Sequence, residues 1–164
     1  MTVRELRSGD AAAVYAAVDV SRPELEAWMS WCTPSYSFAA TEAWVEYAVA
    51  GAVAGRGRQY VVEEAQVLVG VVGFEDIRES SATVGYWIAT PYTGRGLGRR
   101  AVRAAVALAE ADLRLDELVA LVADRNARSR RLIEGLGFAE RQPRVAREVG
   151  VGVRQYVLAV RRDA

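Results

Sequence analysis

The stretch that most constrains the fold of this chain is 84–113, which combines a strand pattern, a glycine-rich turn and a helical pattern. Residues 84–89 are mostly β-branched or aromatic and predict a strand. Pro91 ends it, because proline cannot donate to a strand ladder. Three glycines follow at alternate positions from 94 to 98, and apolar residues spaced three and four apart then indicate a helix. The stretch therefore predicts a strand–turn–helix unit.

The turn has the properties of an anion-binding site. Glycine tolerates positive φ and lets a ligand approach the backbone. The first N–H groups of a helix lack an intrahelical partner and lie at the positive end of its dipole, which suits a phosphate. Arg95, Arg99 and Arg100 add positive charge. The Walker pattern is excluded because the chain has no lysine, and residues 94–98 are one residue short of the dinucleotide fingerprint.

Composition limits the accompanying chemistry. A chain of 164 residues, 52% apolar, suits one domain over 1–164 with a real core. Equal numbers of basic and acidic residues, 21 each, argue against nucleic-acid binding. The absence of histidine excludes a histidine base, triad or metal ligand, and Cys32 alone forms no internal disulfide or thiolate cluster. We therefore expect no metal and a partly buried, reduced thiol.

Targeting signals are not recognisable in the sequence. The N-terminus has no apolar run behind basic residues, and no stretch approaches the length of a membrane span. We therefore expect a cytoplasmic protein that does not bind membranes.

The rest of the chain alternates strand and helix signals. Ser8 or Asp10 can cap a first helix, and Ser21 with Pro23 marks a second helix start. The apolar run 118–122 predicts a strand buried on both faces. The expected elements are strand 2–7, helix 11–18, a helix from 21, helix 42–54, strands 59–64, 66–75 and 84–89, the long helix after the glycines, strand 118–122, helix 127–136 capped by Gly137, and an antiparallel pair around 145–149 and 151–160.

Two motifs together resemble one family. Gly96-Leu97-Gly98 after the Gly85-Tyr86-Trp87-Ile88 strand is similar to the acyl-CoA pyrophosphate loop of the GNAT acetyltransferases, although Thr93 stands where that family usually has Gln or Arg. Asn126-x-x-Ser129 and Gly137-Phe138, about thirty residues later, resemble its second hallmark. Segments 25–31, 41–44, 70–73 and 85–88 are similar to the RimJ/RimL branch of ribosomal-protein N-terminal acetyltransferases, which also has relatives acting on polyamines and antibiotics.

The resemblance implies a fold and a set of ligand contacts. The fold would lie between the α+β and α/β classes, with a mixed, mostly antiparallel sheet of about seven strands, flanked by helices and splayed between its central strands. Acetyl-CoA would be the acyl donor and an amine the acceptor. The implied coenzyme-binding residues are Trp87, Ile88, Ala89, Thr93, Gly94, Arg95, Gly96, Leu97, Gly98, Arg99, Asn126 and Ser129.

The catalytic and acceptor-binding residues are less defined. Many relatives have a tyrosine acid on the helix after the asparagine, but none occurs here between 126 and 138, so Ser129 either bonds the sulfur or simply belongs to the first helical turn. The candidate bases are Glu75 and Glu42, and the alternative is that both are solvated surface groups. Trp28 and Trp31 are three residues apart, which places them on one face of a predicted helix. They either line the acceptor pocket or belong to the core.

Tyr86 and Trp87 are neighbours in the predicted strand and therefore point to opposite faces of it. We accordingly expect only one of them to face any given cleft.

Three functions fit the sequence. The first is acetylation of a protein or peptide N-terminal α-amine. The amine has to be neutral to attack, and about a tenth of such α-amines is neutral at pH 7, compared with about one in 2,500 lysine side chains. The second is acetylation of a polyamine or aminoglycoside, a polycation that Glu24, Glu26, Glu42 and Glu46 would attract. The third is a non-catalytic acyl-CoA-binding regulatory module, given Thr93 and the missing tyrosine. The sequence does not decide among them, and a homodimer is compatible with each.

Overall fold

The computed structural model describes residues 1–142 and 152–160, whose strands form one seven-stranded sheet in the order β1-β2-β3-β4-β5-β7-β6. Neighbouring strands are antiparallel except β4 and β5, which are parallel. The strands are β1 (Thr2–Glu5), β2 (Arg58–Glu64), β3 (Val67–Arg78), β4 (Ser81–Ile88), β5 (Glu117–Ala123), β6 (Ala139–Glu140) and β7 (Val153–Ala159). The α-helices are α1 (Ala11–Asp19), α2 (Arg22–Glu26), α3 (Phe38–Val53), α4 (Leu97–Ala111) and α5 (Ala127–Glu134), and the short 3-10 turns are η1 (Ser8–Asp10) and η2 (Thr90–Tyr92).

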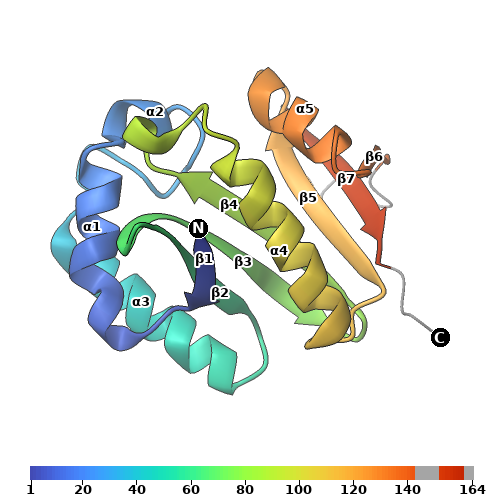
Figure 1. The fold of residues 1–164 in the computed structure, drawn as a ribbon, viewed down its shortest axis with the longest axis horizontal. Coiled ribbons are helices and arrows are strands. Elements are labelled where there is room, and N and C mark those ends of the chain that lie inside the picture. Colours follow the sequence, from blue (N-terminus) through green and yellow to red (C-terminus); the bar gives the residue numbers. More distant parts are fainter. Residues whose placement is uncertain (143–151, 161–164) are drawn as a thin grey trace.

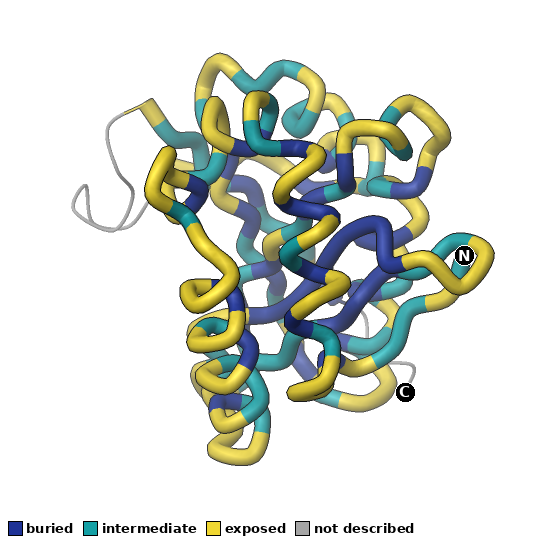
Figure 2. Tube along the Cα trace, turned by 90° about the vertical axis from the view of Figure 1, so that its left-hand side faces the viewer, coloured by how far each residue is buried: buried dark blue, intermediate teal, exposed yellow. Residues whose placement is uncertain are grey.

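The sheet separates two apolar clusters, one on each face (Figure 1). One face packs against α4 and α5, and the buried side of α4 is the stripe that the sequence predicts: Leu97, Ala101, Val102, Ala105 and Ala109. The other face packs against α1 and α3. Burial is concentrated between these layers, and the outward sides of the helices are exposed (Figure 2).

Two helix predictions need correction. Helix α3 begins at Phe38, not Glu42, because the Ser37 hydroxyl accepts a hydrogen bond from the Ala40 N–H at 3.3 Å and caps the helix there. Helix α2 ends at Glu26. Trp28 and Trp31 therefore lie in the turn after α2 and share no helical face.

The predictions for the C-terminal strands are partly confirmed. Strand β5 alternates in burial, with Leu118, Ala120 and Val122 buried and Leu121 45% exposed, so the expectation of burial on both faces is wrong. Leu118, Ala120 and Val122 belong to the apolar cluster that packs against α4 and α5, whereas Leu121 on the opposite face belongs to neither cluster of the described residues. The strand predicted over 151–160 is present as β7, and it pairs antiparallel with β5 and β6. The segment predicted around 145–149 lies outside the described residues.

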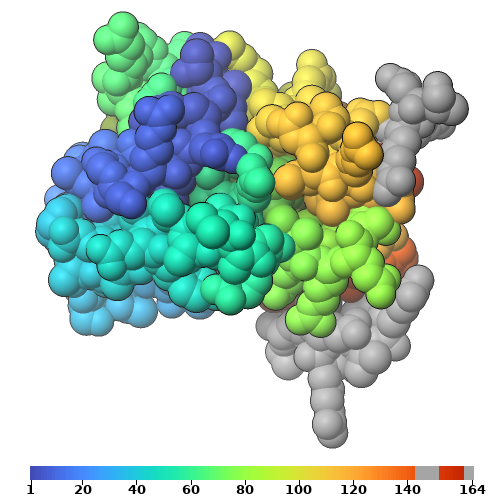
Figure 3. Space-filling view, turned by 90° about the horizontal axis from the view of Figure 1, so that it is seen from below, coloured from blue at the N-terminus to red at the C-terminus, as the bar shows by residue number. Residues whose placement is uncertain are grey.

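The end of α3 is joined to the sheet near the β3–β4 turn. The Ile77 N–H donates to the Arg56 carbonyl at 3.2 Å, and the two segments meet at the surface in Figure 3. Among the described residues, no helix combines the length and apolarity that crossing a membrane would need.

Asp10 stands at the start of α1, but its side chain does not cap the helix. Its carboxylate accepts two hydrogen bonds of 2.9 Å from the Arg4 guanidinium and one of 2.8 Å from the Arg7 N–H. The predicted capping role for Ser8 or Asp10 is therefore wrong. The bonds from Arg4 hold the pKa of Asp10 below its usual value.

We expect Asp10→Asn to lower the free energy of unfolding at pH 7 by about 1.5–3 kcal/mol, as for a lost charged hydrogen bond. A lowered folded-state pKa means that the unfolded chain binds more protons in acid, so this stabilisation is present above about pH 4 and is lost as pH falls through the folded pKa. Urea unfolding measured from pH 7 to pH 2 should therefore show a shallower acid loss in the variant. The more exposed Asp19→Asn is the control. Parallel pH profiles for wild type and Asp10→Asn would contradict the assignment.

Candidate active site

Strands β4 and β5 part after a short stretch of pairing. Only Ser81–Thr83 of β4 pair with residues of β5, namely 117–119, whereas the pairing of β4 with β3 continues to Ile88. The two strands diverge visibly in Figure 1, with the start of α4 beside the opening. The β5-facing edge of residues 84–88 is therefore left unpaired by its neighbour. The predicted splay between the central strands is confirmed.

The strand ladder determines which backbone groups face this gap. The Ala89 N–H donates to the Val69 carbonyl of β3 at 2.8 Å. Because N–H directions alternate along an antiparallel strand, Trp87 also faces β3, and Ile88 directs its N–H toward the gap. Of Trp87, Ile88 and Ala89, which the resemblance implies as coenzyme-binding residues, Ile88 is the one whose N–H is available to a ligand between β4 and β5.

The glycine turn leads directly into α4. Gly94 and Gly96 have φ values of +78° and +74°, the left-handed region that favours glycine. The Arg100 N–H donates to the Gly96 carbonyl at 3.1 Å. The N–H groups of residues 97–99 precede this bond and lack an intrahelical acceptor. The buried side chain of Leu97 fixes the turn to the core, so these three donors are held in place.

The polar side chains of the turn bind nearby carbonyl groups. The Thr93 hydroxyl donates to the Thr90 carbonyl at 2.9 Å, and Arg95 donates to the Pro91 carbonyl at 3.0 Å. Arg99 donates to the Gly135 carbonyl at 2.8 Å. Positive charge thus surrounds the turn, while the Thr93 side chain is engaged within it.

The two sequence motifs meet at Gly98. A Cβ at this position would lie 3.2 Å from the Tyr86 ring and 3.3 Å from the Leu132 side chain, so glycine allows α4, β4 and α5 to approach one another. The Tyr86 hydroxyl lies 3.1 Å from Ser129 Oγ. The Asn126 side-chain oxygen accepts from the Ser129 N–H at 3.0 Å and caps α5. The backbone of Ser129 is therefore held in the first turn of α5, and its hydroxyl is hydrogen-bonded to Tyr86 of β4.

Tyr86 is the site residue that sequence reasoning missed. The resemblance directs attention to the helix after Asn126, which has no tyrosine, but the structure brings one from β4, forty-three residues from Ser129 along the chain. Burial raises the pKa of Tyr86, and the Ser129 hydrogen bond only partly opposes this. The phenol therefore keeps its proton at neutral pH. The sequence does carry one signal for Tyr86: as the neighbour of Trp87 in a strand, it has to point to the opposite face of the sheet.

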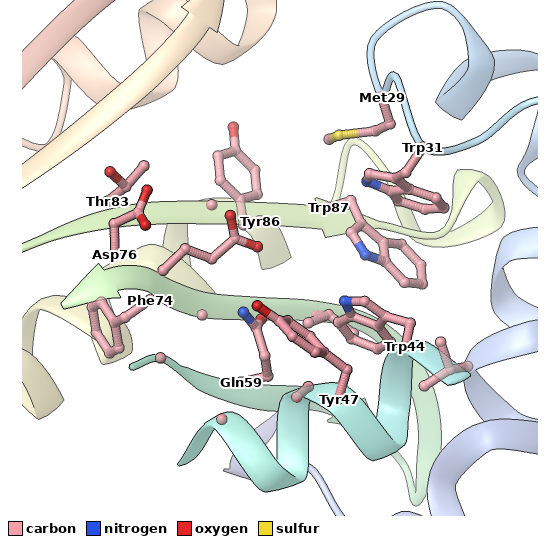
Figure 4. A pocket seen from close by; sticks show the side chains of 18 of the residues that line it. Met29, Trp31, Trp44, Tyr47, Gln59, Phe74, Asp76, Thr83, Tyr86 and Trp87 are labelled. Carbon is pink, nitrogen blue, oxygen red and sulfur yellow. The ribbon is translucent and has the colours of Figure 1, made fainter. Parts of the chain in front are cut away.

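A cavity of about 750 Å³ opens on the other face of the sheet, between β2–β4 and the layer of α1, α3 and the 29–36 turn (Figure 4). Trp31, Trp87 and Glu75 line it, whereas Trp28 and Glu42 are not among its lining residues. Trp87 and Tyr86 belong to opposite apolar clusters and their side chains point to opposite sides of β4 in Figure 4, as predicted, although both residues border the cavity.

Glu75 is far from the unpaired backbone donor. It pairs with Thr83, and five residues, or about 17 Å of strand, separate Thr83 from Ile88. This distance exceeds direct hydrogen-bond reach. As a base, Glu75 would have to act through a chain of water molecules.

Cys32 is 3% exposed, and burial raises the pKa of its thiol. The thiol is thus more fully buried than the sequence predicted. Within 1–142 and 152–160, no three acidic, cysteine or histidine side chains are grouped to hold a metal ion.

Comparison with known proteins agrees with this geometry. The family model of the acetyltransferase (GNAT) domain matches residues 1–139. The solved structure of RimL, a ribosomal L7/L12 α-N-protein acetyltransferase in complex with coenzyme A, has a TM-score of 0.87 at 18% identity, covering 96% of this chain and 93% of that one. The microcin C7 self-immunity acetyltransferase MccE, in complex with acetyl-CoA and AMP, has a TM-score of 0.86 at 15% identity, covering 97% and 92%.

A third structure, spermidine N-acetyltransferase from Vibrio cholerae in complex with CoA and spermine, has a TM-score of 0.79 at 24% identity, covering 97% and 95%. At these identities the likeness concerns the fold. None of the curated proteins compared matches the sequence.

A sheet parted beside a glycine turn defines the acyl-CoA N-acyltransferase fold. With the family match extending over most of its length, this chain belongs to the GNAT acetyltransferase family and is an acetyl-CoA-dependent N-acetyltransferase. Membership of a family of enzymes favours catalysis over the alternative of a non-catalytic binding module.

Proposed function

We propose that this protein transfers the acetyl group of acetyl-CoA to a primary amine, and that the amine is the α-amine of a protein or peptide N-terminus. The observation that carries the proposal is the early end of β4–β5 pairing beside the N-terminus of α4. An extended acyl-CoA arm fits such an opening, with its diphosphate at the helix start.

The N–H groups of residues 97–99 are the proposed diphosphate donors, and the arginines at the turn supply compensating charge. The pantetheine arm would then lie between β4 and β5, against the unpaired edge of β4. The thioester carbonyl would accept a hydrogen bond from the Ile88 N–H, which stabilises the negative charge that develops there during attack.

The reaction balances without another reagent. The neutral amine nitrogen attacks the carbonyl carbon, the carbon–sulfur bond breaks, and the new amide nitrogen loses one proton to water. The departing thiolate gains one proton. Ser129 is the proposed hydrogen-bond donor to the sulfur, and Tyr86 is a positioning residue that orients the Ser129 hydroxyl.

The four glutamates suggested by the sequence as attracting a polyamine or aminoglycoside do not line the cavity, whose acidic residues are Glu75 and Asp76. Glu24 accepts instead from Thr90 at 3.0 Å and from Arg128 at 3.3 Å. An α-amine also needs less help from a base, since about a tenth of it is neutral at pH 7.

The proposed function is tested by thiol release with a panel of peptide N-termini and small amines, beside direct measurement of acetyl-CoA binding. We expect binding and turnover, with peptides preferred over spermidine. Acetyl-CoA binding without turnover of any amine would overturn the proposal. Faster turnover of spermidine than of every peptide would replace the proposed acceptor class with polyamines.

Tyr86→Phe removes only the hydroxyl that contacts Ser129. We expect kcat to fall roughly 2- to 10-fold, the effect of one net hydrogen bond, with the dissociation constant of acetyl-CoA unchanged. Steady-state kinetics and calorimetry measure the two quantities. Tyr60→Phe, at a buried tyrosine of the same apolar cluster, is the matched control. An equal loss in both variants would indicate a general packing effect.

A further inference from the structure

The floor of the cavity is open where two glycines face each other. Gly73 of β3 pairs with Gly85 of β4. The Gln59 side chain covers Gly73, since a Cβ there would lie 2.0 Å from its Oε1 atom. A Cβ at Gly85 would meet nothing within 4 Å, and Gly85 is exposed although it lies on an inner strand of the sheet. The chain thus leaves a flat, uncovered patch of sheet at Gly85.

Aromatic rings surround one end of this patch. The Trp31 ring lies 6.4 Å from that of Trp87 and 5.3 Å from that of Tyr36, with interplanar angles near 55°. Trp44 and Tyr47 of α3 approach from the opposite side (Figure 4). Trp31 is 40% exposed, so part of its face is available to a ligand.

This aromatic wall is anchored by hydrogen bonds. The Thr41 hydroxyl donates to the Tyr36 hydroxyl at 3.0 Å, and Arg22 donates to the Tyr36 carbonyl at 2.9 Å. Helix α3 and the turn after α2 are therefore held together at the cavity. A pocket formed before its ligand arrives loses less entropy on binding.

The charged residues that line the cavity, Arg56, Glu75 and Asp76, come from segments outside its aromatic end. Asp76 and Thr83 are at the far end of the cavity in Figure 4, and Glu75 pairs with Thr83. Four residues, or about 13 Å of strand, separate Thr83 from Trp87. The part of the cavity nearest Ile88 is consequently apolar, which suits a ring better than a second cation.

We propose that the acceptor carries an aromatic ring joined to its amine by a short linker, and that this ring lies over Gly85 between Trp31, Trp44 and Trp87. The proposal rests on the proposed acetyltransferase function and specifies its acceptor. Ring–ring contacts add to the gain from burying apolar area. The cavity of about 750 Å³ is within the range of roughly 300–1,000 Å³ that is typical of small-molecule sites. This volume is much larger than the methyl side chain of an N-terminal alanine would occupy.

The first test compares matched acceptors. One pair consists of peptides that begin with Phe or with Ala, and the other of the free amines phenylethylamine and propylamine. Within each pair, the first member carries an aromatic ring and the second does not. We expect kcat/KM about 10- to 150-fold higher for the aromatic member, the effect of burying one large apolar side chain. If only the peptide pair shows a preference for the ring, the acceptor is a peptide. If both pairs show it, free aromatic amines are acceptors as well. Equal rates within both pairs, or faster turnover of spermidine, overturn the proposal.

Two variants locate the ring. Gly85→Val, in a strand conformation that valine favours, fills the floor and should raise KM for the Phe peptide about tenfold or more relative to its effect on KM for the Ala peptide. Trp31→Ala should reduce the aromatic preference at least fivefold. Phe38→Ala is the control, because Phe38 is equally exposed and lies outside the cavity lining. Retention of the full preference in both test variants would overturn the proposal.

The outcomes separate this inference from the proposed function. If amines are acetylated without any preference for a ring, the function stands and the acceptor assignment is wrong. If acetyl-CoA binds but no amine is acetylated, both are wrong.

Discussion

Replacing Gly96 with alanine should weaken acetyl-CoA binding about tenfold or more, a change of about 1.4 kcal/mol or more in binding free energy. Gly96 has φ of +74° immediately before α4, where an L-residue costs roughly 1–2 kcal/mol. The turn can relieve this strain by moving the N–H groups of residues 97–99 away from the diphosphate. Calorimetric titration with acetyl-CoA measures the effect.

Gly55→Ala provides a matched control. Gly55 has φ of +70° at the end of α3, and the space around its missing side chain is equally open. The two variants should lose similar free energy of unfolding, while Gly55→Ala keeps its affinity for acetyl-CoA. Equal affinity in both variants would show that the conformation at Gly96 does not matter to the coenzyme.

Ser129→Ala should lower kcat about 100-fold, at the lower end for loss of a general acid, while changing acetyl-CoA affinity far less. The reason is that the Ser129 hydroxyl acts on sulfur only as the carbon–sulfur bond breaks. Single-turnover kinetics with saturating acetyl-CoA isolate this step. An unchanged kcat would exclude the role and leave Ser129 as an ordinary residue of the first turn of α5.

A double-mutant cycle with Tyr86→Phe strengthens this test. Because Tyr86 is proposed to act through Ser129, the double variant should be no slower than Ser129→Ala alone. Independent losses that multiply would show that Tyr86 influences the reaction by another route.

The sequence predicted the glycine turn before α4 and the helix start at Asn126 because each depends on local chemistry. Alternate glycines, a proline stop and a 3–4 apolar stripe specify the turn before α4 without reference to the rest of the chain. Asn126 and Ser129 are likewise neighbours within one helical turn. The resemblance then predicted how these pieces are arranged, including the splay between β4 and β5.

The rest of the site depends on contacts that a sequence does not display. Tyr86 meets Ser129 because β4 and α5 pack around Gly98, and Gly85 faces Gly73 because of the β3–β4 register. The backbone donor also depends on register: pairing of Ala89 with Val69 leaves Ile88 as the group facing the gap. The turn containing Trp31 was mistaken for helix because tryptophans three residues apart fit helical spacing by chance.

A crystal structure with bound coenzyme A tests the central claim most directly. We predict that the diphosphate accepts hydrogen bonds from the N–H groups of residues 97–99, with the pantetheine arm between β4 and β5 and its sulfur beside Ser129. A coenzyme bound elsewhere, or β4 and β5 paired along their full length in its presence, would contradict the account.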